Sequence, residues 1–242
     1  MTSGLNDVAL ARPKPPAKLA AMVKLIAGER LQFKPGSRFL YSNDGYILLG
    51  AIIEHLSGQS YDRYVREHAF KPAGMSHTDV SVYVPAAVPS MAHGYTLVPN
   101  GGPASPTPAQ ESRPMPLRDN STMPQIANPS GGAYPTVEDL ARFAQALLDD
   151  RLLTPAMTAT VLKPRVDAPQ PGGPPVDAYT YGFAYQQINH VTFVGHNGGT
   201  PGYEGQIDIY PHTDDVVVIL ANQDQTMVPA IQKSEAILTH SS

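Results

Sequence analysis

The chain has 242 residues, of which 42% are hydrophobic and 16% are charged, and its formal net charge is −4. This composition suits a globular protein with a sizeable core, and the lack of a basic cluster argues against nucleic acid as a partner. The absence of cysteine excludes disulfides and thiolate chemistry, and no apolar run approaches the ~18 to 20 residues that span a bilayer.

Two helices are predicted in the first quarter of the chain. Residues 17–27 carry their apolar side chains on roughly one face, which is typical of an amphipathic helix. A turn at residues 35–36 precedes the second helix. We expect this helix to begin at Asn43 or Asp44, whose short side chains suit an N-cap, and to end at residues 57–58.

Tyr41 and Asn43 are the first candidate functional residues. They would lie on a short loop in front of a buried helix, where a phenol and an amide can serve proton transfer and substrate hydrogen bonding. The alternative is a plain junction between a loop and a helix. Ser42 lies between them, but no general base is implied beside it, so we do not expect it to be a nucleophile.

Three further helices are predicted in the middle of the chain. Residues 59–70 form the first, with Ser60 as its cap and Pro72 as its stop. Residues 136–139 resemble a capping box at the start of the second, and the third covers residues 153–162.

Residues 79–129 are the least regular part of the chain. Proline and small polar residues are dense there. A loop this long inside a compact domain is either disordered or part of a site. Beyond it, the glycines that follow Ser130 indicate close backbone approach, although a tight turn into a helix explains Ser130 equally well.

The last third of the chain has the short, β-rich segments of a strand meander followed by a helix. Short links between these segments imply antiparallel neighbours. Helices first, then strands, then a helix predict an α+β domain with helices packed on an antiparallel sheet. The expected strands cover residues 181–188, 191–194, 205–210 and 216–221, and the expected helix covers residues 228–238.

His196 opens the second candidate motif, which continues through Asn197, Gly198 and Gly199. It follows a predicted strand, and its glycines let the backbone come close to a ligand. The alternative for His196 is a hairpin residue bonded to the backbone. We expect no metal site, because the histidines lack ligand spacing.

The combined order of these motifs resembles the serine β-lactamase and penicillin-binding-protein superfamily, nearest to its class C β-lactamase, DD-peptidase and family VIII esterase group. The resemblance is carried by residues 34–50, 57–61, 71–78 and 196–203. It runs from residue 2 to about residue 223 and is weak in the Pro-rich middle. It implies one β-lactamase-like domain over residues 1–242, in which residues 79–129 wall the substrate cleft.

The resemblance also implies roles for the candidate residues. Tyr41 would shuttle a proton, Asn43 would hold the substrate carbonyl or a catalytic lysine, and His196 would support the leaving group or a carboxylate from across the cleft. The Gly199 N–H would be an oxyanion donor. The substrate-binding residues would then be Asn43, Asn197, Gly198 and Gly199.

The Ser-x-x-Lys motif of the superfamily does not occur in this sequence. Residues 1–5 look like a segment downstream of that motif, so we expect the N-terminal part of the fold to be missing. The chain is either a fragment of a longer enzyme or a natural short form. The Gly-x-Ser-x-Gly elbow and the P-loop do not occur either.

Two functions are therefore carried forward. The first is hydrolysis of an ester, amide or β-lactam by a serine hydrolase without a cofactor, and the second is a non-catalytic binding or remnant domain of the same fold. Loss of the N-terminal strands would leave an exposed sheet edge, which predicts homodimerisation or aggregation. No signal peptide is visible, and the sequence leaves the compartment open.

Overall fold

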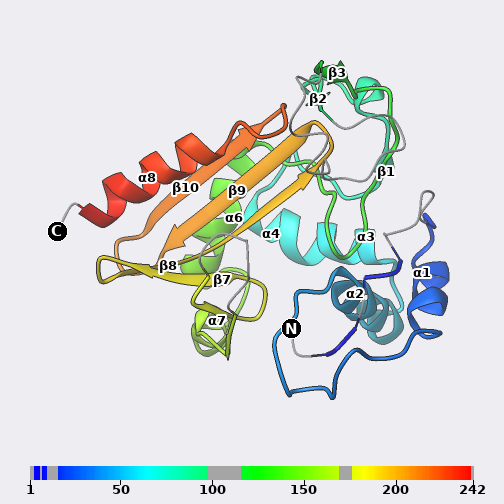
Figure 1. Cartoon of the computed structure of the whole chain (residues 1–242), viewed down its shortest axis with the longest axis horizontal. Coiled ribbons are helices and arrows are strands. Elements are labelled where there is room, and N and C mark those ends of the chain that lie inside the picture. The colour runs from blue at the N-terminus through cyan, green and yellow to red at the C-terminus, as the bar shows by residue number, and fades with distance from the viewer. Residues whose placement is uncertain (1–2, 6, 10–15, 98–115, 169–175, 241–242) are drawn as a thin grey trace.

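The computed structural model describes residues 3–5, 7–9, 16–97, 116–168 and 176–240, and it places a helical part beside a twisted sheet (Figure 1). The sheet is antiparallel, with strand order β10-β9-β8-β7-β6-β5. This confirms the predicted α+β class. The sheet strands are β5 (Val166–Asp167), β6 (Ala178–Tyr179), β7 (Ala184–Ile188), β8 (Val191–Thr200), β9 (Tyr203–Tyr210) and β10 (Asp215–Ala221).

Helices cover both faces of this sheet. On one face Val194 and Ile209 pack against Leu147 of α6 (Val137–Leu148). On the other face Phe193 stacks on Tyr210 with ring centroids 4.9 Å apart. α8 (Val228–His240) covers the side of the sheet opposite α6 (Figure 1). Because successive side chains of a strand point to opposite faces, β8 is buried on both sides where it crosses the sheet.

The helical part contains α1 and α2 followed by a composite helix. Met22, Ile26 and Ile47 form its core between α1 and α2, as the apolar spacing predicted. The composite helix passes from α-helix to π-helix and back. These elements are α1 (Leu19–Ile26), α2 (Asn43–Ser57), α3 (Tyr61–Val65), η1 (Arg66–Phe70) and α4 (Lys71–Ala73).

Two predicted helix ends are wrong. The N-cap of α2 is Ser42, whose Oγ accepts the Gly45 N–H at 3.1 Å. The side chain of Asp44 is used elsewhere, because it accepts backbone N–H groups from Val8 and Ala9. Pro72 does not stop the composite helix, since it lies in the first turn of α4, where a missing N–H is tolerated.

The capping prediction for α6 is confirmed, because Thr136 Oγ1 accepts the Asp139 N–H at 3.2 Å. The next helix, α7 (Pro155–Leu162), begins two residues after the predicted start at residue 153 and ends at the predicted residue. Among the described helices, none has the length and apolar character needed to cross a bilayer.

The middle of the chain contains two short pairs of strands joined by irregular segments. β1 (Val82–Tyr83) pairs with β4 (Gln125–Ile126), and β2 (Tyr95–Thr96) pairs with β3 (Arg118–Asp119), with the 3-10 turn η2 (Pro85–Ala87) between β1 and β2. Part of the predicted insertion, residues 98–115, lies outside the described residues.

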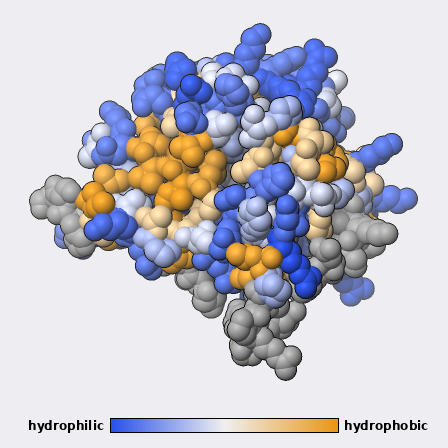
Figure 2. All heavy atoms as spheres, turned by 90° about the horizontal axis from the view of Figure 1, so that it is seen from above, coloured by the Kyte–Doolittle hydropathy of each residue, from blue (hydrophilic) through white to orange (hydrophobic). Residues whose placement is uncertain are grey.

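β10 lies at one edge of the described sheet. Figure 2 shows apolar surface gathered over the end of the molecule that carries α8 and β10. Leu220 of β10 is 37% exposed, and Val228 and Ile237 of α8 are 57% and 53% exposed.

Candidate active site

A cavity of about 300 Å³ opens between the helical part and the sheet. The helical part contributes residues before α2, in α2, in α3 and in η1. The sheet side contributes β8 and the turn before β7. The lining residues are Tyr41, Tyr46, Tyr61, Val65, Phe70, Val80, Asn128, Pro129, Ser130, Gly131, Ala133, Gly182 and His196.

Tyr41 and His196 are the two candidate residues that line this cavity. Tyr41 comes from the loop before α2 and His196 from β8, and their ring centroids are 5.9 Å apart. Strand alternation places His196 on the same sheet face as Val194, which is the α6 face. The two motifs, far apart in sequence, therefore meet at one cavity.

Both ring nitrogens of His196 have partners. Nδ1 lies against the Asn197 carbonyl oxygen, which can only accept, so Nδ1 carries the proton. Nε2 of the neutral ring then accepts from the Tyr179 hydroxyl at 2.8 Å. Burial lowers the pKa of His196, against a smaller opposing effect of the Asn197 carbonyl, so this neutral tautomer is the stable form near neutral pH.

Tyr179 extends the contact of His196 into an aromatic cluster. Its hydroxyl is 3.5 Å from the Tyr46 hydroxyl, and its ring is edge-on to Tyr41 with centroids 6.4 Å apart. Burial, followed by the proximity of Tyr46 and Asp7, raises the pKa of Tyr41 to about 12. Tyr41 is therefore a neutral phenol that can give or relay a proton.

Asp7 holds the start of α2 in place. Its Oδ1 accepts the Ser42 hydroxyl at 3.1 Å and the Asp44 N–H at 3.1 Å. Its Oδ2 accepts Asn43 Nδ2 at 2.8 Å. The Asn43 amide is thus oriented by Asp7, and its Oδ1 is the atom that can accept from a further donor.

Substituting Asp7 with alanine is expected to lower the free energy of unfolding by about 2 kcal/mol, because three hydrogen bonds to one carboxylate are lost. Chemical denaturation measures this. Asp167→Ala is the matched control, since Asp167 is exposed on β5. Equal stability of the two variants would contradict the role of Asp7.

The backbone of residues 197–199 faces an open side of β8. A two-residue turn links β8 to β9, so the residues that flank it, Thr200 and Tyr203, form a hydrogen-bonded pair. Alternation then turns the N–H and C=O groups of Asn197 and Gly199 away from β9. The pairing of β8 with β7 ends at Gly195 opposite Ala184, so these groups point past the end of β7. Of the three residues, Asn197 is engaged through its carbonyl.

The serines of the candidate motifs have structural contacts. Ser42 is 1% exposed and caps α2, and Ser3 Oγ accepts the Leu5 N–H. Ser130 lines the cavity, but its hydroxyl donates to Asn128 Oδ1 at 2.6 Å. The Ser42 hydroxyl also donates to the Asp7 carboxylate, but Ser42 is buried and is not among the residues that line the cavity. The contacts given for Ser3 and Ser130 include no general base of the kind that activates a serine.

Sequence reasoning missed Tyr179 and Asp7. Tyr179 lies on the two-residue strand β6, which is too short to show a period of two. Asp7 precedes the first predicted helix, in a stretch for which the sequence indicated no element. The only local signal was the polar Ser-Asn-Asp run at residues 42–44, which needs a partner for each side chain once α2 is buried.

Comparison with known proteins adds three findings. A family model described as Beta-lactamase matches residues 1–241. A penicillin-binding protein of Bacillus subtilis strain 168 is 29% identical over 213 residues, which are 84% of this chain and 44% of that protein. The crystal structure of a penicillin binding protein from Bacillus halodurans has a TM-score of 0.78 and 26% identity, and covers 98% of this chain and 70% of that chain.

The fold is also that of the D-amino acid amidase from Ochrobactrum anthropi SV3, solved in complex with D-phenylalanine. The TM-score is 0.75 with 22% identity, over 99% of this chain and 70% of that chain. This chain therefore spans less than half the length of the curated relative and about 70% of each of these two structures.

Proposed function

The chain belongs to the beta-lactamase family, and we propose that it forms most of a serine-hydrolase site that transfers an acyl group from an ester, amide or β-lactam to water. The nucleophilic serine and its lysine are expected on a segment outside this chain, in a Ser-x-x-Lys motif. The observation that supports this proposal is the meeting of Tyr41 and His196 at one cavity.

In this proposal the serine oxygen bonds to the substrate carbonyl carbon, and its proton passes through Tyr41 to the leaving group. Water then attacks the acyl-enzyme, and the serine oxygen regains a proton as the acid departs. Splitting one difficult step into two easier ones is the gain from covalent catalysis. The neutral phenol of Tyr41 is in the protonation state that a relay needs.

The other candidate residues take supporting roles. Asn43 accepts from the lysine through Oδ1, because Asp7 already holds its Nδ2. The Gly199 N–H acts as an oxyanion donor from the open side of β8, and the glycine backbone of residues 198–199 lets substrate approach closely. His196 Nε2, an acceptor in the neutral ring, takes a hydrogen bond from a protonated leaving group that replaces the Tyr179 hydroxyl, and it supports a substrate carboxylate only when the ring is protonated.

A non-catalytic binding or remnant domain is the second candidate function, and the absence of Ser-x-x-Lys from this sequence favours it. The coding DNA upstream of Met1 separates the two. An in-frame Ser-x-x-Lys motif supports the hydrolase, whereas a genuine stop before Met1 supports the binding domain.

Covalent labelling tests the hydrolase proposal. We expect the 242-residue chain to form no adduct with a fluorophosphonate or a labelled penicillin, and to hydrolyse a p-nitrophenyl ester at no more than ~10³ to 10⁴ times the rate in water, because positioning and oxyanion stabilisation remain without a nucleophile. Tyr41→Phe should change this residual rate little.

The protein extended to include Ser-x-x-Lys should label on that serine, and Tyr41→Phe should then slow acylation by about 100-fold. Intact mass and peptide mapping locate the adduct. Stoichiometric labelling of Ser3, Ser42 or Ser130 in the 242-residue chain would show that the fold uses another nucleophile.

We also propose that the edge of β10 associates with a second copy of this chain. An unpaired edge strand presents free backbone groups, and exposed apolar side chains of β10 and α8 lie beside it (Figure 2). Sedimentation velocity should detect a dimer that Leu220→Lys disrupts and Leu56→Lys, on the exposed side of α2, leaves intact. A monomer at high micromolar concentration would contradict the proposal.

A further inference from the structure

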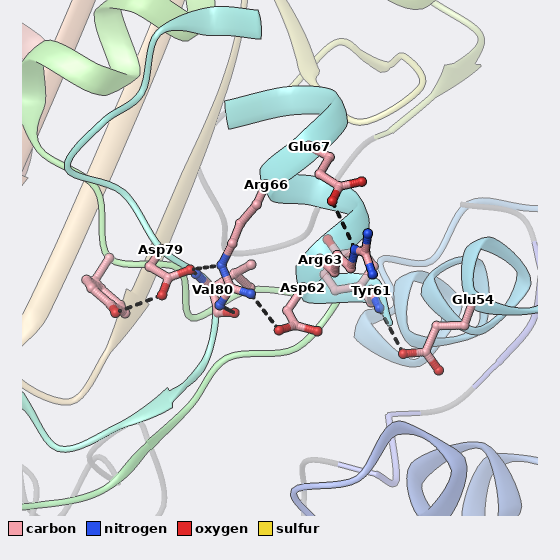
Figure 3. Close-up of polar contacts among 9 residues, drawn as sticks. Glu54, Tyr61, Asp62, Arg63, Arg66, Glu67, Asp79 and Val80 are labelled. Carbon is pink, nitrogen blue, oxygen red and sulfur yellow. Dashed lines mark hydrogen bonds and ion pairs between the residues drawn. The ribbon is translucent and has the colours of Figure 1, made fainter. Parts of the chain in front are cut away.

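The two sides of the active-site cavity are held in place differently. On the helical side, charged side chains form a network around the composite helix (Figure 3). Arg66 Nε contacts Asp79 Oδ1 at 2.5 Å, and its Nη1 contacts Asp62 Oδ2 at 2.6 Å. Asp79 also accepts the Tyr134 hydroxyl at 3.3 Å, so the network joins η1 to the residue that follows the cavity-lining Ala133.

On the sheet side, the end of β8 that carries residues 197–199 has a neighbouring strand on one side. β7 pairs with β8 only as far as Gly195, and beyond that point β9 is the partner of β8 among the described strands. Residues 197–199 are exposed, and two of them are glycines, which have the most backbone freedom. The position of the Gly199 N–H therefore depends on β9 and on the turn that joins β9 to β8.

The turn between β8 and β9 is not of a type that hairpins favour. Its central residues are Pro201 and Gly202. Proline fixes the first φ at about −65°, and Gly202 has a φ of 83°, which together are typical of a type II turn. The types that match the twist of paired strands, I′ and II′, need a positive φ at the first position, whereas a type II turn splays the strands. This end of the hairpin therefore needs contacts from outside to keep β8 in place.

Two side chains from other parts of the chain hold the central peptide of this turn. Asn120, which follows β3, donates from Nδ2 to the Pro201 carbonyl oxygen. Asp224, which follows β10, accepts the Gly202 N–H on Oδ1 at 2.5 Å. These two groups belong to one peptide unit, and types I and II differ chiefly in the direction in which that unit points. Asn120 and Asp224, the two tethers of the turn, therefore fix its type.

Both tethers are themselves held by the segment around β2, which lies with β3 at this end of β8 and β9 (Figure 1). Asp224 Oδ2 accepts the Thr96 hydroxyl at 2.6 Å and the Leu97 N–H at 2.9 Å. The Asn120 N–H donates to the Gly94 carbonyl oxygen at 2.7 Å, and Asn120 is 1% exposed. The turn is thus attached to a part of the chain outside the sheet.

We propose that Asp224 and Asn120 are positioning residues for the oxyanion donor: by fixing the peptide between Pro201 and Gly202, they fix the end of β8 and thereby the Gly199 N–H. The catalytic role rests on the proposed hydrolase function; the attachment of the turn does not. An oxyanion donor must lie about 3 Å from the position that the oxyanion occupies, so a small displacement of the strand weakens it. Neither tether lines the cavity, so both act through the backbone.

Kinetics of the protein extended to include Ser-x-x-Lys test the catalytic role. Asp224→Ala removes all three hydrogen bonds of the carboxylate. It should lower kcat for a p-nitrophenyl ester about 10-fold, less than the roughly 100-fold or more for removal of a donor outright. KM should change less than about 3-fold, because an oxyanion donor acts in the transition state. Asn120→Ala should act in the same direction.

Two further variants separate positioning from stability. Asp224→Asn keeps an acceptor for the Gly202 N–H and should recover part of the lost kcat, and Asp167→Ala at an exposed position should match the wild type. Rates are expressed per serine labelled by penicillin at completion. A merely structural role would lower the amount of labelled protein and leave kcat per site unchanged, and that result in both alanine variants would overturn the proposal.

Backbone relaxation measured by NMR in the 242-residue chain tests the tethers without turnover. The amide order parameter of Gly199 should be close to the value for rigid backbone, about 0.85, in the wild type and in Asp167→Ala. It should fall below about 0.6 in Asp224→Ala and in Asn120→Ala. A rigid Gly199 in both folded alanine variants, or a mobile one in the wild type, would contradict the role of the tethers.

The two measurements distinguish this proposal from the hydrolase proposal. Loss of order at Gly199 in the variants, together with no serine labelling in the extended protein, would keep the attachment of the turn and reject its catalytic role along with the hydrolase. Serine labelling with an unchanged kcat in both alanine variants would reject the positioning role alone.

Discussion

Replacing Asp208 with asparagine is expected to raise the free energy of unfolding by about 2 kcal/mol at pH 8, because this carboxyl is fully buried and incompletely paired. Gln206 Nε2 donates to Oδ1, but Oδ2 has no hydrogen-bond partner among the described residues. Burial raises the pKa of Asp208 to about 6, Gln206 opposes this rise, and Glu235 adds to it.

The sign of the pH dependence follows from this shift. Between the unfolded pKa of about 3.8 and the folded pKa of about 6, the folded state binds more protons, so stability falls as pH rises. The full cost, about 3 kcal/mol for two pKa units, is present above pH 6 and absent below pH 4. Loss of the charge-assisted bond from Gln206 offsets part of the gain in the variant.

Urea unfolding of the wild type and Asp208→Asn at pH 4 and pH 8 measures the effect. The two proteins should be similar at pH 4 and should separate at pH 8, while Asp167→Asn at the exposed control position should follow the wild type throughout. An Asp208→Asn variant less stable than the wild type at pH 8 would mean that a cation partners the carboxylate.

The sequence predicted the elements whose signals are local. Helix α2 ends at Gly58, which has φ of 68°, and glycine is the residue that adopts this conformation without strain. The Thr136 cap of α6 was predicted for the same reason, since it depends on residues three apart in sequence.

Contacts between distant segments determine the features that local patterns did not predict. β8 was predicted to end at Val194, yet it continues to Thr200 because β9 pairs with it from Val194 to Thr200. The candidate site shows the same limit. The sequence indicated Tyr41 and His196 separately, but the contacts of Asn43 with Asp7 and of His196 with Tyr179 join distant segments without a motif.

The substitution Gly195→Ala is expected to be strongly destabilising and to disturb the site. A Cβ at this position would lie 2.2 Å from Asp208 Oδ1 and 2.4 Å from the Ile207 carbonyl oxygen. The carboxylate could turn, but the carbonyl belongs to the paired backbone of β9 and cannot move without parting the strands. We therefore expect a loss of about 3 kcal/mol in the free energy of unfolding, the upper range for overpacking.

The matched control is Gly205→Ala on the adjacent strand. Its Cβ would meet Leu220 Cδ2 at 3.1 Å and the Ile219 carbonyl oxygen at 4.0 Å, so a side chain can give way. We expect this variant to stay within about 1 kcal/mol of the wild type, because small shifts absorb the methyl group and the unfolded chain loses freedom.

A second measurement separates local damage from global loss. Gly195 precedes His196, so displacement of β8 from β9 should move the imidazole away from Tyr179 and let water reach Nε2. The pKa of His196, followed by NMR in the folded variant, should then rise towards its usual value, since burial is what lowers it. Gly205→Ala should leave that titration unchanged. A stable Gly195→Ala protein with an unaltered His196 titration would show that β8 and β9 can separate locally without disturbing the site.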